Sequence, residues 1–91
     1  MGPKAYSQEI EKLRRAGMRP TSQRLALAKI LFERGHRHVT AESLYAEARN
    51  SFIPISLATV YNSLNQFTQS GLLREIIVDP QRCYFDTNTA D

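Results

Sequence analysis

An α+β fold, mostly α, in which helices are followed by a two-stranded β-hairpin, is predicted by three observations. Apolar residues recur at helical spacing through most of the chain up to residue 70. Thr21, Thr40 and Ser56 each stand where a helix N-cap is expected. Beyond Gly71 the period becomes extended and branched apolar residues dominate. Since 91 residues leave room for one modest core, we expect residues 1–91 to form a single domain.

The first two helices follow from their apolar residues and their ends. Residues 5–16 are expected to be helical, with Ile10 and Leu13 as a short apolar stripe and Gly17 at the C-terminus. Thr21, which follows Pro20, caps a second helix that closes near Gly35. The apolar side of this second helix consists of Leu25, Ala28, Leu31 and Phe32.

The remaining elements complete a recognisable order. Residues 36–39, HRHV, are expected to form a loop, and Thr40 caps a third helix that runs to Asn50. Residues 51–55 are predicted to form an extended linker, because Pro54 disfavours helix at the preceding residue. Ser56 caps a fourth helix over residues 57–70, and strands at 72–78 and 82–87 meet at a turn of Asp79 and Pro80. Helices followed by a hairpin in this order are typical of a winged helix-turn-helix fold.

The fourth helix contains no charged residue. At about 100° per residue its inner stripe consists of Leu57, Val60, Leu64 and Phe67. The opposite side carries Ala58, Thr59, Asn62, Asn65, Gln66 and Gln69, and Tyr61 lies on the border. Amides and hydroxyls can exchange hydrogen bonds with base edges in a DNA major groove. The alternative interpretation is an ordinary amide-rich surface exposed to solvent.

The positive charge lies elsewhere. Residues 1–24 hold six Lys or Arg against two Glu, whereas residues 25–91 hold six against seven acidic residues. This segregation indicates an anionic polymer as the partner, with phosphate contacts supplying affinity and the neutral helix supplying sequence discrimination. The candidate phosphate or minor-groove contacts are Arg14, Arg15, Arg19 and Arg24. Arg24 could equally extend past its apolar neighbours to water, and Arg82 at the hairpin tip is a weaker candidate.

Several classes of protein are disfavoured. No apolar run approaches the length of a membrane span, and the N-terminus lacks the apolar region of a secretory signal, so we expect a cytoplasmic protein. No nucleophile triad, glycine-rich phosphate loop or paired acid-base carboxylates can be assigned, so we expect no enzyme. A winged-helix module that binds another protein without DNA specificity remains the alternative, although the basic first quarter favours DNA.

Three segments resemble the ferric uptake regulators. These segments are AGMRPTSQR at 16–24, HVTAESLY at 38–45 and SLATVYNSLNQFTQSGLL at 56–73. The resemblance implies a bacterial metal-responsive transcription factor whose winged-helix half is followed by a dimerisation and metal-binding domain, which we expect to be absent from residues 1–91. It further implies that Arg19 is the minor-groove basic residue, that Tyr61 is the recognition-helix tyrosine and that Arg24 opens the second helix.

One position departs from the main branch of that family. The residue after Tyr61 is usually arginine there, but it is Asn62 in this sequence. The run ATVYNSLNQF resembles the iron response regulators of alphaproteobacteria, which respond to iron through haem and bind iron-control elements. We therefore expect a base preference that differs from the main branch.

The resemblance also implies metal binding, because members of the family bind iron, manganese or zinc. His38 and Asp86 match positions of the family's ligand shell, but two ligands cannot complete a zinc or iron site. The His36 and His38 pair is by itself a weak ligand signal. We therefore expect no tightly bound metal or cofactor in this chain.

The resulting prediction is sequence-specific binding of double-stranded DNA at an AT-rich palindromic operator. The predicted contacts are Arg15, Arg19, Arg24, Ser56, Thr59, Tyr61 and Asn62, with Arg82 on the wing. One helix reads only a half-site, so a homodimer is expected for the full-length protein, whereas the 91-residue chain is expected to be mostly monomeric.

Overall fold

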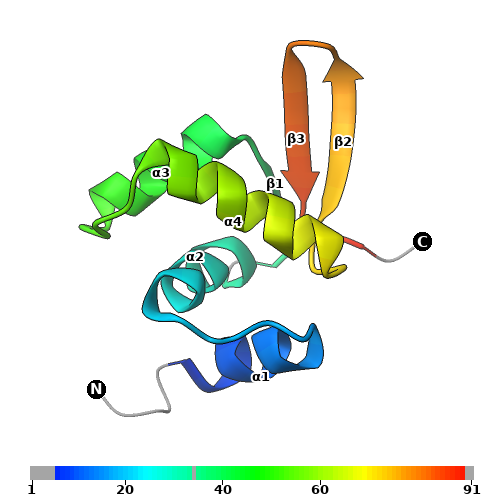
Figure 1. The fold of residues 1–91 in the computed structure, drawn as a ribbon. Coiled ribbons are helices and arrows are strands. Elements are labelled where there is room, and N and C mark those ends of the chain that lie inside the picture. Colours follow the sequence, from blue (N-terminus) through cyan, green and yellow to red (C-terminus); the bar gives the residue numbers. More distant parts are fainter. Residues whose placement is uncertain (1–5, 34, 90–91) are drawn as a thin grey trace.

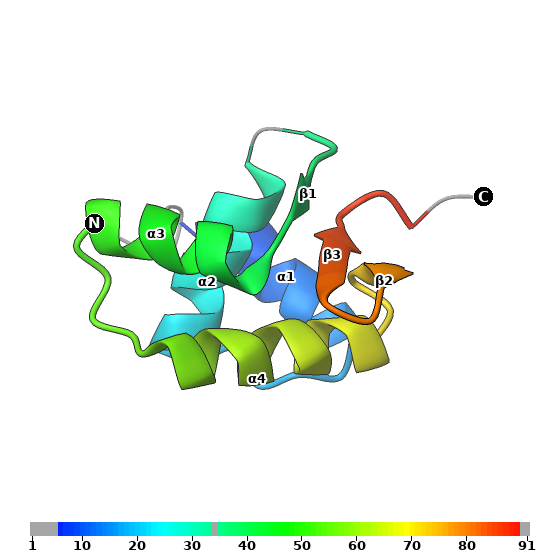
Figure 2. The same ribbon diagram turned by 90° about the horizontal axis from the view of Figure 1, so that it is seen from above.

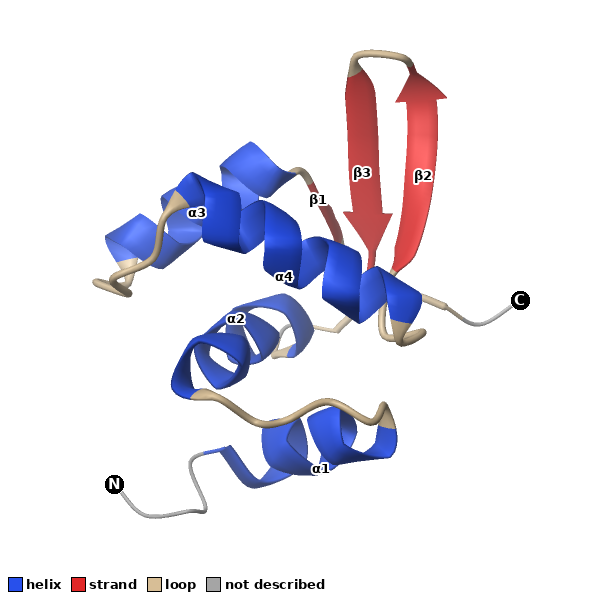
Figure 3. Cartoon of the chain, viewed as in Figure 1, coloured by secondary structure: helices blue, strands red, loops and turns tan. Residues whose placement is uncertain are grey.

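The computed structural model describes residues 6–33 and 35–89. The described helices are α1 (Ser7–Arg15), α2 (Ser22–Phe32), α3 (Ala41–Asn50) and α4 (Leu57–Gln69). The described strands are β1 (His38–Val39), β2 (Arg74–Asp79) and β3 (Arg82–Asp86). The helices gather on one side of the molecule, and the β2–β3 hairpin projects from them at the C-terminal end of α4 (Figure 1, Figure 3). The predicted winged helix-turn-helix fold is confirmed; the residue 5 start of the first helix lies outside the described residues.

The three predicted N-caps are confirmed. Thr21 Oγ1 accepts a hydrogen bond from the amide of Arg24 at 3.3 Å. Thr40 and Ser43 form a reciprocal capping box at the start of α3, with both bonds at 3.0 Å. Ser56 Oγ accepts from the amide of Thr59 at 3.1 Å. Each cap satisfies an amide that would otherwise lack a partner in the first helical turn.

The start of the wing differs from the prediction. Gly71 has a φ of 88°, a left-handed conformation that lets the chain reverse at the end of α4. The amides of Leu72 and Leu73 then bond to the carbonyl of Phe67 at 2.9 and 3.3 Å. These two leucines therefore close the helix, and the strand predicted from residue 72 begins at Arg74.

The prediction of a loop at residues 36–39 is wrong for residues 38 and 39. His38 and Val39 form β1, which pairs antiparallel with β3 so that Val39 lies opposite Phe85. The sheet has the order β1-β3-β2 and is three-stranded rather than a hairpin alone. The turn between β2 and β3 is also one residue later than predicted, because Asp79 pairs with Arg82. A two-residue strand has too little sequence to show a period of two, so only its partner reveals it.

The linker predicted at residues 51–55 begins with a turn. Phe52 has a φ of 59° and is 93% exposed. The amide of Phe52 donates to the carbonyl of Arg49 at 3.1 Å, and the amide of Ile53 donates to the carbonyl of Ala48 at 2.9 Å. This is the hydrogen-bond pattern of a Schellman helix end, in which glycine is the usual left-handed residue. Because position 52 is phenylalanine and not glycine, the sequence carries no signal for this turn.

The core is formed between the helices and the inner side of the sheet. Its largest side chains with less than 2% exposure are Phe67, Leu13, Leu27, Leu31, Leu44, Leu64 and Val60. The predicted inner stripe of α4 is confirmed except that Leu57 is half-buried, and Ser63 is buried in addition. On α1, Ile10 is only half-buried whereas Glu9 is 8% exposed. No helix among residues 6–33 and 35–89 is long and apolar enough to cross a membrane.

Candidate nucleic-acid interface

The outer face of α4 is exposed and uncharged. Its exposed residues are Ala58, Tyr61, Asn62, Asn65, Gln66 and Gln69. On the other face Val60, Leu64 and Phe67 are fully buried and hold the helix against the core. A helix whose inner face is fixed in this way presents its outer side chains in a constant orientation, which reading of base edges requires.

Two predicted contacts at the start of α4 are hydrogen-bonded to each other. The hydroxyls of Ser56 and Thr59 are 2.9 Å apart, and Ser56 also caps the helix. Thr59 was assigned to the outer face, but it is half-buried. The pair therefore has a structural task, and the exposed hydroxyl of the two belongs to Ser56.

Tyr61 reaches back to the preceding helix. Its side chain is 42% exposed, and its hydroxyl donates a hydrogen bond of 2.5 Å to Oε2 of Glu42, in the first turn of α3. This bond holds the pKa of Glu42 below its ordinary value and raises the pKa of Tyr61 above its own. Both shifts follow from the hydrogen bond, which favours a carboxylate paired with a protonated phenol.

Arg24 connects the rest of the basic segment, residues 12–24, to α4. Its Nη1 donates to the carbonyl of Arg19 at 2.9 Å, and its Nη2 donates to Oε1 of Gln66 at 3.0 Å. The Arg24 side chain is half-buried and bonded within the protein. It is therefore neither a free phosphate contact nor a side chain that simply extends into water. Arg24 fixes the distance between the loop that carries Arg19 and the outer face of α4.

Arg19 is the exposed cation nearest to this bridge in the sequence. The segment joining α1 to α2, drawn in light blue, runs along the same edge of the molecule as α4 (Figure 2). Within the part of the chain that the structure describes, Arg19 has no side-chain hydrogen bond or ion pair. An arginine with free donors beside an uncharged helix face can bind a phosphate or enter a minor groove next to the groove that α4 occupies.

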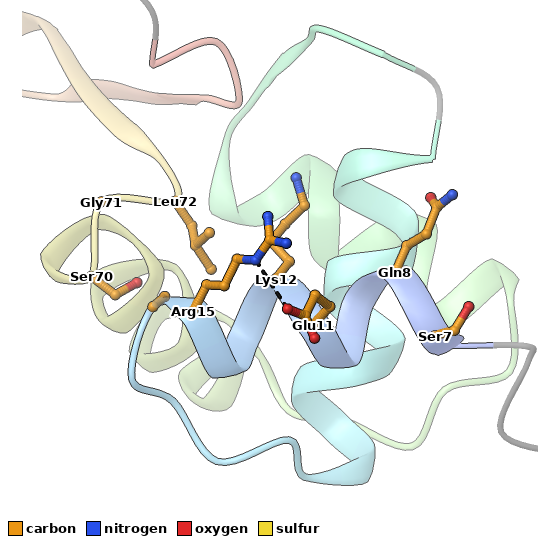
Figure 4. Close-up of a pocket in the computed structure, with 9 residues that line it drawn as sticks. Ser7, Gln8, Glu11, Lys12, Arg15, Ser70, Gly71 and Leu72 are labelled. Atoms are coloured by element: carbon orange, nitrogen blue, oxygen red, sulfur yellow. Dashed lines mark hydrogen bonds and ion pairs between the residues drawn. The ribbon is translucent and has the colours of Figure 1, made fainter.

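Arg15 lies in a different environment. It borders an open hollow between α1 and the turn after α4, lined also by Lys12, Ser70, Gly71 and Leu72 (Figure 4). Its Nε bonds to Oε1 of Glu11 at 3.0 Å, and both side chains are mostly exposed. The four-residue spacing of Glu11 and Arg15 is a sequence signal for this pair, which the prediction did not use. Part of the charge counted for the basic segment is thus balanced locally.

Arg82 is paired as well. Its Nε lies 2.9 Å from Oδ2 of Asp79 across the hairpin turn. This hydrogen bond, together with one from the amide of Gln81, holds the pKa of Asp79 below its ordinary value. The wing tip therefore carries an exposed ion pair rather than a free cation.

His38 and Asp86 are brought together but do not complete a metal site. They lie opposite each other on β1 and β3, and the His38 ring meets that of Tyr84 edge-on at 5.9 Å. No group of three or more His, Cys, Asp or Glu side chains in the described residues is arranged to hold a metal ion. Two donors fall short of the four ligands that a structural zinc site uses, so the residues present do not fit a resident metal.

The sequence reasoning missed Glu42. It precedes Tyr61 by 19 residues, on another helix, and nothing in its own surroundings marks it as a partner. Gln66 was placed on the outer face, but its bond to Arg24 was equally hidden because it joins residues 42 positions apart. Both contacts depend on how α2, α3 and α4 cross.

Comparison with known proteins identifies the family. The model of the ferric uptake regulator family matches residues 15–91. The chain belongs to the ferric uptake regulator family. The peroxide-responsive repressor PerR of Staphylococcus epidermidis is 38% identical over 82 residues, which cover 90% of this chain and 54% of the relative. PerR of Staphylococcus aureus strain USA300 is also 38% identical over 82 residues, which cover 90% of this chain and 55% of the relative.

Solved structures of ferric uptake regulators agree in fold. The protein from Pseudomonas aeruginosa with manganese has a TM-score of 0.81 and 32% identity, covering 87% of this chain and 59% of that one. The Vibrio cholerae ferric uptake regulator has a TM-score of 0.78 and 31% identity, covering 85% and 59%. The chain spans about half the length of the curated relatives it matches. Residues 6–33 and 35–89 have the winged-helix fold found in these ferric uptake regulators.

Proposed function

We propose that this chain binds double-stranded DNA sequence-specifically, with α4 in the major groove and the loop of Arg19 on the adjacent backbone or minor groove. The observation that carries the proposal is the uncharged, exposed face of α4, which the hydrogen bonds of Arg24 connect to that loop. Phosphate contacts give affinity without sequence information, and base contacts discriminate, so the two tasks need not share a segment.

The proposed contacts divide by chemistry. Tyr61 and Asn62 reach base edges from the outer face of α4, where an amide can pair with an adenine edge. Arg19 binds the backbone or the minor groove, and the exposed Ser56 hydroxyl at the start of α4 meets phosphate. The guanidinium groups of Arg15, Arg24 and Arg82 are already bonded within the protein, and Thr59 is half-buried, so we assign these four residues secondary contacts.

We further propose that two copies act together on an AT-rich palindromic operator. A single recognition helix covers a half-site, and two-fold symmetry in the protein matches two-fold symmetry in the DNA. The full-length protein is then a homodimer, while the 91-residue chain is mostly monomeric without DNA. A stable DNA-free dimer in sedimentation at micromolar concentration contradicts this.

The finer assignment is to the iron response regulator branch. It rests on Asn62, which follows Tyr61 where the main branch usually has arginine, and it implies that the full-length protein responds to iron through haem. If Asn62 sets the preference of this branch, Asn62→Arg changes the preferred bases in a selection from random duplexes. An unchanged preference contradicts the assignment, and so does a full-length protein that binds no haem in an absorbance titration.

Metal belongs to the full-length protein in this proposal. Full-length members of the family are expected to bind iron, manganese or zinc, whereas this chain offers only His38 and Asp86. Equilibrium dialysis of the 91-residue chain against iron or manganese is expected to show no stoichiometric tight site. One tightly held ion per chain overturns this part.

The main experiment compares an AT-rich palindromic iron-control duplex with a scrambled duplex over a salt series, using wild type and Tyr61→Ala. We expect wild type to prefer the palindrome and Tyr61→Ala to lose that preference while keeping the salt dependence. The affinity should fall with a log-log slope near −0.9 for each neutralised phosphate. Equal binding to both duplexes indicates a nonspecific binder. Absence of binding to either favours a winged-helix module with a protein partner.

A further inference from the structure

The proton of the Tyr61 hydroxyl is already used inside the protein. The hydroxyl donates to Glu42 Oε2 at 2.5 Å, and an ionised carboxylate can only accept. The direction of the bond is therefore fixed by chemistry. A carboxyl is ionised and a phenol is protonated around neutral pH, and the lowered pKa of Glu42 and the raised pKa of Tyr61 widen the pH range over which this holds.

A phenol has one proton to donate and oxygen lone pairs to accept with. With the proton committed to Glu42, the exposed part of Tyr61 offers DNA its lone pairs and its ring. In the major groove the hydrogen-bond donors are the exocyclic amines, N6 of adenine and N4 of cytosine. Purine N7, guanine O6, thymine O4 and the phosphates all accept and therefore cannot pair with such an oxygen.

We propose that Glu42 is a specificity-determining positioning residue, which makes Tyr61 an acceptor that reads a base amine. This inference rests on the proposed DNA binding and deepens it, because it states which chemical group of the operator the tyrosine recognises. Glu42 acts through Tyr61 and need not touch the DNA.

As the acidic residue in the first turn of α3, Glu42 favours the helix N-terminus, but this structural task is a weak one for an exposed side chain. The residue is exposed, and an exposed side-chain pair of this kind stabilises a fold little. Glu47 of the same helix differs, since it is half-buried and forms a two-pronged ion pair with Arg37. A carboxylate beside the outer face of α4 also repels phosphate, which lowers the affinity for DNA. What the Glu42 carboxylate does is orient the Tyr61 hydroxyl and make it an acceptor toward DNA.

The test uses an operator duplex that the wild-type 91-residue chain selects from a random library. Each adenine and cytosine is replaced in turn by an analogue without its exocyclic amine, and each purine by its 7-deaza analogue without the N7 acceptor. For wild type we expect one position in each half-site where amine removal weakens binding about five- to tenfold. Tyr61→Phe loses the sensitivity at that position.

Two Glu42 variants separate the position of the carboxylate from its charge. Glu42→Ala removes both, whereas Glu42→Asp keeps the charge but withdraws the acceptor by one methylene. We expect both to lose most of the amine sensitivity, because the hydroxyl is no longer held with its proton toward Glu42 and can turn to donate to DNA acceptors instead. Glu33→Ala, which removes one exposed acidic side chain at the end of α2, is the matched control and should behave as wild type.

A DNA-free readout keeps the two proposals distinguishable. The Tyr61 phenol, followed by carbon NMR with Tyr61→Phe as the assignment control, should titrate at lower pH in Glu42→Ala than in wild type. An unchanged titration overturns the inference whatever happens with DNA. Amine sensitivity retained by both Glu42 variants also overturns it, as does Tyr61-dependent sensitivity to N7 removal. Failure of wild type to select any sequence overturns the proposed function and this inference together.

Discussion

The basic segment of residues 12–24 and the outer face of α4 differ in how the side chains proposed to contact DNA, Arg19 and Tyr61, are held. On α4 two polar side chains are held by other helices: Tyr61 bonds to Glu42, and Gln66 bonds to Arg24. In the basic segment Arg19 has no side-chain partner within residues 6–33 and 35–89. A charge attracts phosphate over several ångströms and tolerates movement, whereas a hydrogen bond to a base edge fails with a small displacement. Anchoring and reading therefore need different degrees of order.

Arg24 belongs to both regions. It carries the charge of the basic segment, yet its two hydrogen bonds join Arg19 to the reading face. The comparison therefore predicts that its geometry matters as much as its charge.

The largest effect is expected from the inner face of α4. Phe67→Ala removes a fully buried aromatic side chain and should lower the free energy of unfolding by about 3–5 kcal/mol. Asn62→Ala, on the outer face, should change it by less than about 0.5 kcal/mol. Urea unfolding measures both. Similar losses in the two variants would show that the faces of α4 are not divided between stability and reading.

Arg24 gives the next effect. Arg24→Ala and Arg24→Lys should both lower the preference for operator over scrambled duplex about tenfold, because lysine cannot make two bonds in a fork. The free energy of unfolding should fall by about 1 kcal/mol in each variant. Competition binding with the two duplexes measures the preference. If lysine restores the wild-type preference, charge alone explains Arg24.

The anchor is tested through salt. Arg19→Ala should weaken binding to any duplex and reduce the log-log salt slope by about 0.9. Arg15→Ala is the matched variant, and its change should be smaller because Glu11 already balances that charge. Fluorescence anisotropy over a salt series gives both slopes. Equal changes of the slope in the two variants would mean that the ion pair with Glu11 does not prevent Arg15 from binding phosphate.

The smallest effect is expected at the wing tip. The folded protein depresses the pKa of Asp79 below 3.8, so the stabilisation is present above that value and is lost as the pH falls through the folded pKa. Asp79→Asn should therefore have a slightly lower Tm than wild type at pH 7 and the same Tm in strong acid. Arg82→Ala removes the other partner and should show the same pH dependence. A Tm difference for Asp79→Asn that grows on acidification contradicts this assignment.

Local chemistry determined most of the fold. Thr21, Thr40 and Ser56 were recognisable as caps because a cap bonds only to the helix that follows it. The buried stripe of Val60, Leu64 and Phe67 was equally readable from a period of 3.6 residues. The residue types of the reading face and the excess of charge before residue 25 needed no more than the sequence.

Tertiary structure decided the rest. β1 exists only because Val39 finds Phe85 across the sheet, and Leu72 leaves the predicted strand because its amide closes α4. The partners of Tyr61 and Arg24 lie 19 and 42 residues away, on other helices. Periodicity and capping describe neighbours within a few positions, whereas the crossing of helices sets which distant side chains meet. The sequence by itself thus determined which groups the protein offers to a partner, and only the fold decided which of them are held fixed.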